Sequence, residues 1–124
     1  MERTRVIIAD DEAIVRMDLR EMLTNMGYLV VGEVGDGQSA VNLARELKPD
    51  LVTLDIVMPE MDGVEALRAI RQEHPDAHVV MISAIDQRAK LSECIQLGAI
   101  DFVVKPFDKQ RLQSLFQTYL HAGR

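Results

Sequence analysis

Five short apolar runs alternate with five segments of helical spacing along the 124-residue chain. The runs are rich in branched residues and centre on 6–9, 29–34, 51–54, 79–82 and 102–104. They are mostly continuous rather than alternating, which is typical of strands buried on both faces. Between them, apolar residues recur three or four positions apart, as on amphipathic helices, over 15–26, 40–47, 64–70, 91–95 and 112–119. The pattern predicts strands and helices in strict alternation.

Residues at the predicted element ends support this division. Gly27 stands where a glycine commonly ends a helix, and Pro49 ends the second helix. Asp62 has the position of a helix N-cap, with Glu65 three residues later in capping-box spacing. The fourth helix is expected to begin after Asp86.

Strict alternation of this kind indicates a parallel sheet with helices on both faces. We therefore expect an α/β fold with a doubly wound, five-stranded parallel sheet, in which a strand–helix unit repeats five times. Residues 1–124 are expected to form a single domain, because the connections are short and no linker interrupts them. In such sheets ligands bind at the carboxyl ends of the strands, where the strand order reverses.

Several polar side chains follow the predicted strands directly. Taken singly, each has an ordinary explanation, since an acid after a strand often caps the next helix. Together, three carboxylates in one crevice would repel one another, and Lys105 would offset one charge. A hard divalent cation such as Mg²⁺ is the natural complement. These strand-end residues are Asp10, Asp11 and Glu12 after the first strand, Asp55 after the third, Ser83 after the fourth, and Lys105-Pro106 after the fifth.

The position of Asp55 suggests a chemical role. A carboxylate beside Mg²⁺ and a lysine can attack a phosphoryl group and form an acyl phosphate. Phosphoryl transfer requires positive charge near the phosphoryl oxygens, which Mg²⁺ and Lys105 would supply, and Ser83 would add a hydrogen bond. The residues therefore predict a phosphoacceptor site.

Composition excludes several other classes. The net charge of −6 argues against direct nucleic-acid binding, and one cysteine excludes an internal disulfide. The sequence contains no apolar run long enough to span a membrane and no signal peptide, so a cytoplasmic location is expected.

The chain resembles the receiver domain of two-component response regulators from residue 4 to about residue 120. The likeness rests on four stretches in order: Ala9-Asp10-Asp11-Glu12, residues 54–63 around Asp55, Ser83-Ala84, and residues 101–107 around Lys105-Pro106. It implies a flavodoxin-like fold in which a histidine kinase or histidine phosphotransfer protein phosphorylates Asp55.

The resemblance also implies roles for the other site residues. Asp10, Asp11, Asp55 and the backbone carbonyl of Val57 would surround Mg²⁺, while Ser83 and Lys105 would bind the phosphoryl oxygens. Phe102 would be the switch aromatic that turns inward together with Ser83, although an ordinary core phenylalanine is the plain alternative. The peptide bond between Lys105 and Pro106 would be cis.

The expected output is protein–protein signalling. Phosphorylation would reshape the surface formed by the fourth helix, fifth strand and fifth helix, for a downstream protein target, and dimerisation is left open. We expect no effector domain in this sequence, and no enzymatic activity beyond phosphotransfer and autodephosphorylation. Ile14 and Met17 are candidate contacts for the kinase. Val57 and Ile85 are apolar where a side chain could position a water, which predicts a long-lived acyl phosphate.

Four alternative functions match parts of the sequence. A dinucleotide-binding domain could use residues 35–40, which match G-x-G-x-x-A, but these follow the second strand and place Asp36 where a pyrophosphate would bind. A phosphohydrolase would carry a second acid at the position of Val57. A degenerate receiver that serves only as a scaffold would lack part of the residue set. Finally, the chain could be a receiver fragment of a longer RNA- or DNA-binding regulator, since its first half resembles receivers that precede antitermination domains.

Overall fold

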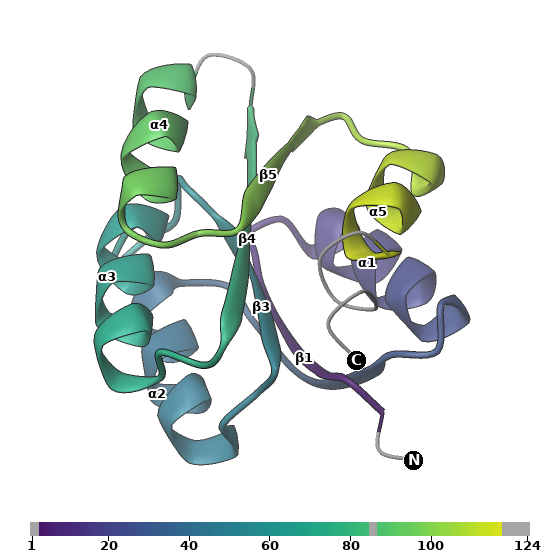
Figure 1. The fold of residues 1–124 in the computed structure, drawn as a ribbon, viewed down its shortest axis with the longest axis horizontal. Coiled ribbons are helices and arrows are strands. Elements are labelled where there is room, and N and C mark those ends of the chain that lie inside the picture. Colours follow the sequence, from purple (N-terminus) through teal and green to yellow (C-terminus); the bar gives the residue numbers. More distant parts are fainter. Residues whose placement is uncertain (1–2, 85–86, 118–124) are drawn as a thin grey trace.

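The computed structural model describes residues 3–84 and 87–117 of the chain. Five strands and five helices alternate through these residues (Figure 1). In chain order they are β1 (Arg5–Ala9), α1 (Ala13–Asn25), β2 (Leu29–Val34), α2 (Gly37–Leu47), β3 (Leu51–Asp55), α3 (Gly63–Glu73), β4 (His78–Ala84), α4 (Arg88–Gln96), β5 (Asp101–Lys105) and α5 (Lys109–Phe116).

The strands form one parallel sheet in the order β2-β1-β3-β4-β5. Ala9 on β1 lies beside Leu54 on β3, so the residues that follow these two strands are neighbours. The strand order reverses between β1 and β3, and this places the expected crevice at their carboxyl ends. The predicted α/β fold is confirmed.

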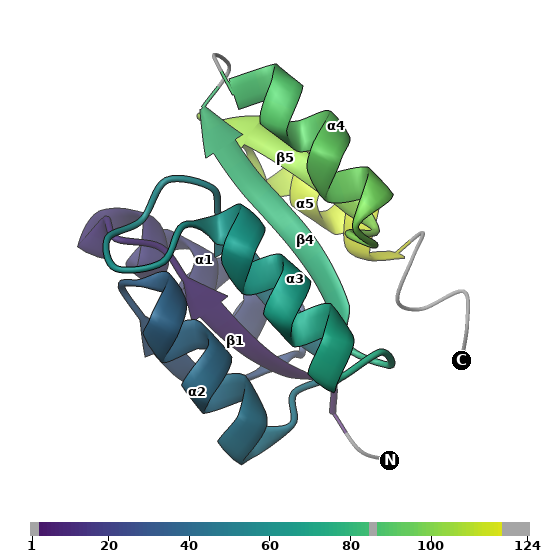
Figure 2. The ribbon, with the colours of Figure 1, turned by 90° about the vertical axis from the view of Figure 1, so that its left-hand side faces the viewer.

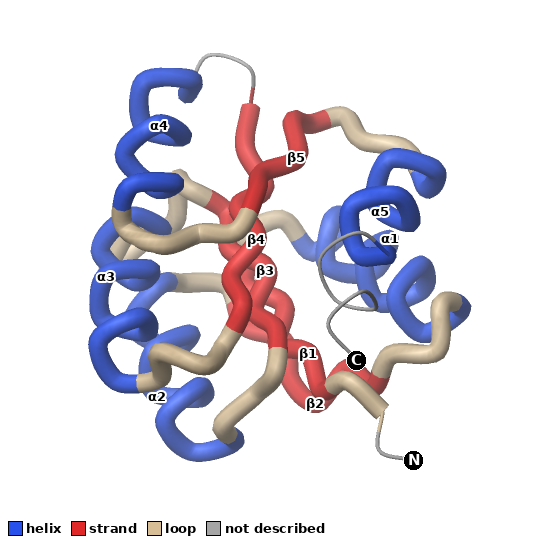
Figure 3. Tube along the Cα trace, viewed as in Figure 1, coloured by secondary structure: helices blue, strands red, loops and turns tan. Residues whose placement is uncertain are grey.

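The helices cover both faces of the sheet. Helices α2, α3 and α4 lie on one face, and α1 and α5 lie on the other (Figures 1 and 3). Seen from the α2–α4 side, these three helices stand in front of the strands (Figure 2). Each face has its own buried apolar cluster: Ile7 and Ala9 of β1 belong to the α2–α4 side, while Val6 and Ile8 belong to the α1–α5 side. This alternation explains why β1 is apolar at every position after Arg5.

Most predicted element ends agree with the structure. Gly27 has a φ of 94° after α1, and α2 ends at Leu47 with Lys48 as its C-cap, directly before Pro49. The Asp62 carboxylate caps α3 by accepting a hydrogen bond from the Glu65 amide at 3.0 Å. Asp86, expected before the fourth helix, and Tyr119, expected on the apolar stripe of the fifth, lie outside the described residues.

One predicted core position is wrong. Leu91 and Cys94 of α4 are buried, but Ile95 is 43% exposed because one helical residue turns it about 100° away from Cys94.

The longest helix within residues 3–84 and 87–117 is α1, and none there is sufficiently long and apolar for a membrane span.

Candidate functional site

Four carboxylates converge at the carboxyl ends of β1 and β3. One oxygen from each of Asp10, Asp11, Glu12 and Asp55 lies within 4.8 Å of the others. Asp10 and Asp55 meet because β1 and β3 are paired neighbours, and Asp11 and Glu12 continue from β1 into the start of α1. The structure therefore brings together the three aspartates that the sequence placed in one crevice, and it adds Glu12.

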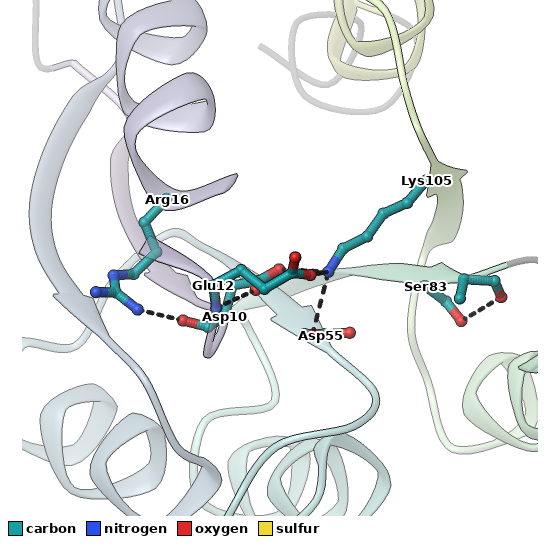
Figure 4. A network of polar contacts seen from close by, with 7 residues as sticks. Asp10, Glu12, Arg16, Asp55, Ser83 and Lys105 are labelled. Carbon is teal, nitrogen blue, oxygen red and sulfur yellow. Dashed lines mark hydrogen bonds and ion pairs between the residues drawn. The ribbon is translucent and has the colours of Figure 1, made fainter. Parts of the chain in front are cut away.

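The ammonium group of Lys105 reaches this cluster from the end of β5. Its Nζ lies 2.9 Å from Glu12 Oε1, 3.0 Å from Asp10 Oδ2 and 3.3 Å from Asp55 Oδ2 (Figure 4). Burial acts to lower the pKa of Lys105, but its contacts with Glu12 and Asp10 and the charge of Asp55 outweigh this and raise the pKa above its usual value. Lys105 is therefore a fixed positive charge directly beside Asp55.

The Asp55 side chain is only 8% exposed. Desolvation by burial, followed by repulsion from Asp10, raises its pKa to about 6, although Lys105 acts in the opposite direction. At neutral pH the side chain is therefore mostly ionised, and burial and repulsion from Asp10 make its charged form unfavourable. Binding a cation or forming a covalent bond offsets the charge of such a buried carboxylate, and this lowers the free energy of the folded protein.

Asp10 is anchored from two sides but retains one unsatisfied oxygen. Its Oδ1 accepts a hydrogen bond from the Glu12 amide at 2.9 Å, and its backbone carbonyl accepts one from Arg16 at 2.6 Å. Its Oδ2 is buried and forms the ion pair with Lys105, yet it accepts no hydrogen bond from the residues that the structure describes. A buried carboxylate oxygen without a hydrogen-bond donor, close to three other carboxylates, fits a hard cation with oxygen ligands, such as Mg²⁺.

The cluster opens into a cavity of about 260 Å³. Val57, with 54% of its surface exposed, lies on the wall of this cavity just after Asp55. The cavity is large enough for a small anion and its waters beside the carboxylate. The lining residues are Asp11, Glu12, Asp55, Val57, Ala84, Gln87 and Lys105.

The remaining predicted residues lie at the side of this cluster. The Ser83 hydroxyl donates to the carbonyl of Ala84 at 3.0 Å, away from Asp55 and Lys105 (Figure 4). Phe102 is half-buried and lines a groove with residues of α4, including Leu91 and Ile95. The bond between Lys105 and Pro106 is cis. Ile85 lies outside the described residues.

Glu12 is the residue whose role sequence reasoning missed. From sequence it was an acid at a helix start, and it does hold the N-cap position of α1, but its side chain makes no capping hydrogen bond. It pairs instead with Lys105, 93 residues away. The only sequence signal was a third acid after Asp10-Asp11, which is equally common at helix starts.

Two glycines allow the surrounding backbone to close around the site. A Cβ at Gly63 would lie 2.0 Å from the Asp55 carbonyl oxygen, and one at Gly37 would lie 1.8 Å from the Met61 carbonyl oxygen. The first residue of α3 therefore touches the backbone of Asp55, and the first residue of α2 presses on the loop between β3 and α3. That loop carries Val57.

We expect Gly37→Ala to lower the free energy of unfolding by about 2 kcal/mol, because a backbone carbonyl must move to admit the methyl group. Gly32→Ala is the matched control, since its Cβ would meet the Leu43 side chain, which can rotate away. Urea titrations of both variants measure the difference. Equal losses would show that the Gly37–Met61 contact places no special constraint on the fold.

The geometry does not favour the dinucleotide-binding alternative. The N-terminus of α2, where a pyrophosphate would bind, is capped by the Asp36 carboxylate, which accepts from the Ser39 amide at 2.7 Å and from its hydroxyl at 2.9 Å. The Met61 carbonyl occupies the space beside Gly37. The glycine-rich stretch is therefore a tight turn and a helix cap.

Comparisons with known proteins identify the family of this chain. The sequence model of the response regulator receiver domain matches residues 6–117. Chemotaxis protein CheY of Thermotoga maritima is 47% identical over 108 residues, which cover 87% of this chain and 90% of the relative. Transcriptional regulatory protein PdtaR of Mycobacterium tuberculosis is 48% identical over 103 residues, which cover 83% of this chain and 50% of PdtaR.

A solved structure shows the same architecture. The CheX-CheY-BeF₃-Mg²⁺ complex from Borrelia burgdorferi contains a chain that superposes with a TM-score of 0.88 and 33% identity, over 94% of this chain and 90% of that one. Phosphorylation of an aspartate and signalling to partner proteins are general properties of the matched family. By fold, sequence and the carboxylates and lysine at its strand ends, this chain belongs to the response regulator receiver domain family.

Proposed function

We propose that Asp55 is the phosphoacceptor of this receiver domain and that a histidine kinase or histidine phosphotransfer protein is the donor. The observation that carries the proposal is the position of Lys105 Nζ, 3.3 Å from a buried Asp55 carboxylate with a raised pKa. A carboxylate oxygen of Asp55 forms a bond to phosphorus, and the bond from phosphorus to the donor imidazole nitrogen breaks. The nitrogen keeps the electron pair, and the product is an acyl phosphate.

The neighbouring side chains stabilise the phosphoryl group in different ways. The Lys105 ammonium binds a phosphoryl oxygen and neutralises part of its charge. The Ser83 hydroxyl leaves the Ala84 carbonyl and donates to a second oxygen. Its movement makes room for Phe102 to turn inward from the groove beside α4. Hydrolysis of the acyl phosphate returns the domain to its starting state, and no separate enzymatic activity is proposed.

The metal in this proposal is Mg²⁺. Asp10, Asp11, Asp55 and the Val57 carbonyl would hold it, and it would neutralise the charge of the transferring phosphoryl group. The unsatisfied Oδ2 of Asp10 supports this assignment. The positive charge of the cation would also offset the repulsion among the aspartates.

Two surfaces are assigned to partner proteins. The face of α4, β5 and α5, which includes the Phe102 groove, would bind the downstream target after phosphorylation. On α1, Ile14 and Met17 are 72% and 54% exposed beside the site and would contact the donor. Size exclusion with and without beryllofluoride tests whether phosphorylation also produces a homodimer.

Incubation with acetyl phosphate and Mg²⁺, followed by intact-protein mass spectrometry, tests the proposed function. We expect a gain of one phosphoryl group that chelation of the metal prevents and that Asp55→Asn abolishes. Circular dichroism of Asp55→Asn verifies that the variant is folded. Absence of any gain, or a gain that survives in Asp55→Asn, would refute the assignment. NAD binding in the same preparation would favour the dinucleotide alternative.

The apolar surface of Val57 predicts a slow loss of the phosphoryl group. Val57 lines the cavity but offers no hydrogen bond to an attacking water. We expect Val57→Asn to shorten the lifetime of the acyl phosphate about tenfold by positioning that water, and Val57→Ala to leave it unchanged. The rate of phosphate release after removal of the donor measures both. Equal rates in the two variants would contradict this role.

A further inference from the structure

Glu12 makes a contact that the proposed phosphoryl transfer does not use. Its Oε1 lies 2.9 Å from Lys105 Nζ, and its side chain is 60% exposed on the rim of the cavity beside Asp55. The Glu12 carboxylate has no other hydrogen bond to the residues that the structure describes, whereas its backbone amide is held by Asp10. The side chain is therefore anchored mainly through Lys105.

Three carboxylates already surround the Lys105 ammonium group. An ammonium group has three N–H donors. Glu12 and Asp55 accept hydrogen bonds from Lys105, and Asp10 forms an ion pair with it. To bind a phosphoryl oxygen, Lys105 must give up one of these partners. The Asp10 and Asp55 side chains are 1% and 8% exposed, so water cannot readily replace Lys105 around them. Glu12 is the partner that solvent can take over at low cost.

We propose that Glu12 is a positioning residue that competes with the phosphoryl group for Lys105. Before phosphorylation it holds the ammonium group at the cavity rim, and on phosphorylation it releases that group to a phosphoryl oxygen. The proposal rests on Asp55 being the phosphoacceptor. Glu12 therefore destabilises the phosphorylated state, because Lys105 must leave Glu12 to contact the phosphoryl group.

The local charge acts in the same direction. Four carboxylates against one ammonium leave three formal negative charges around the cavity that receives the anion. Removing Glu12 both frees Lys105 and lowers the repulsion felt by an incoming phosphoryl group. Two variants separate these effects: Glu12→Asp keeps the charge but shortens the reach, and Glu21→Gln removes a charge about 13 Å farther along α1.

The test is a titration with beryllofluoride at saturating Mg²⁺, followed by amide NMR, on wild type, Glu12→Gln, Glu12→Asp and Glu21→Gln. We expect Glu12→Gln to tighten beryllofluoride binding about threefold to fivefold, the size of an exposed ion pair. Glu12→Asp should tighten it nearly as much, and Glu21→Gln should match wild type. Mg²⁺ affinity, measured separately without beryllofluoride, should fall or stay equal in Glu12→Gln, so tighter metal binding cannot explain the result.

Three results would overturn the proposal. Binding by Glu12→Gln that is equal to or weaker than wild type would remove the competition, and wild-type binding by Glu12→Asp would show that charge alone matters. An equal effect in Glu21→Gln would show that the net charge of α1, and not the Glu12–Lys105 contact, sets beryllofluoride affinity. If wild type binds no beryllofluoride and gains no phosphoryl group, the proposed function fails with it. If wild type does both and the variants do not differ, only the role of Glu12 fails.

Discussion

Asp55→Asn is expected to raise the free energy of unfolding of the metal-free protein by about 3 kcal/mol at about pH 8. Burial and the neighbouring Asp10 raise the pKa of Asp55 to about 6 in the folded chain. A carboxyl with a higher pKa in the folded than in the unfolded state stabilises the fold while it is protonated. That contribution is lost as the pH rises through about 6, and the wild type then carries the cost of a buried charge that the amide lacks.

Denaturant unfolding in EDTA across the pH range measures this effect. The advantage of Asp55→Asn should vanish below about pH 4, where the carboxyl is neutral in both states. Asp18→Asn makes the same chemical change at an exposed position of α1 and should leave stability nearly unchanged. Mg²⁺ should reduce the advantage, because it binds the wild type more tightly than the variant. An advantage that does not change with pH would mean that Asp55 ionisation is not its source.

Lys105→Met is expected to have a comparable effect of opposite sign. Without the ammonium, the buried carboxylates of Asp10 and Asp55 have lost their ion pairs with Lys105. Removing one partner of a buried ion pair costs about 3 kcal/mol. The metal-free variant should therefore unfold at much lower denaturant than wild type at neutral pH. Saturating Mg²⁺ should restore part of the loss by supplying the missing positive charge.

Two variants serve as controls for Lys105→Met. Lys105→Arg keeps the charge and should retain most of the stability. Arg45→Met breaks another close pair, in which Arg45 Nε lies 2.7 Å from Glu73 Oε1 on the exposed surface of α2 and α3, and should cost little. If Arg45→Met and Lys105→Met destabilise equally, burial is not what makes the Lys105 pairs important. Equal losses with and without Mg²⁺ would argue against a cation at the carboxylates.

The strand ends were the part of the site that sequence predicted well. Continuous apolar runs located β1 and β3, and the polar residue after each was therefore a candidate for the crevice. Asp10 and Asp55 meet because their strands are paired side by side, as expected of a parallel sheet whose strand order reverses there. The residue types alone then indicated a cation and a phosphoryl group.

Side-chain orientation was less accessible from sequence. Ser83 stands at the predicted strand end, yet its hydroxyl donates to the neighbouring Ala84 carbonyl rather than toward Asp55. A hydroxyl has several staggered rotamers, and nearby backbone acceptors compete for it. The exposure of Ile95, one residue after the buried Cys94, has a similar cause, since apolar character does not by itself state which side of a helix is covered.

The sequence by itself determined how strands and helices alternate along the chain, where several helices end, and which side chains follow the strands. These features depend on periodicity, caps and turns, which are local properties of the chain. Tertiary structure decided that Glu12 contacts Lys105 across 93 residues and that Asp55 is buried with a pKa of about 6. Both depend on how α1 and the ends of β1, β3 and β5 are placed around one cavity. Distances and desolvation between segments far apart in the chain set these interactions, and no local pattern records them.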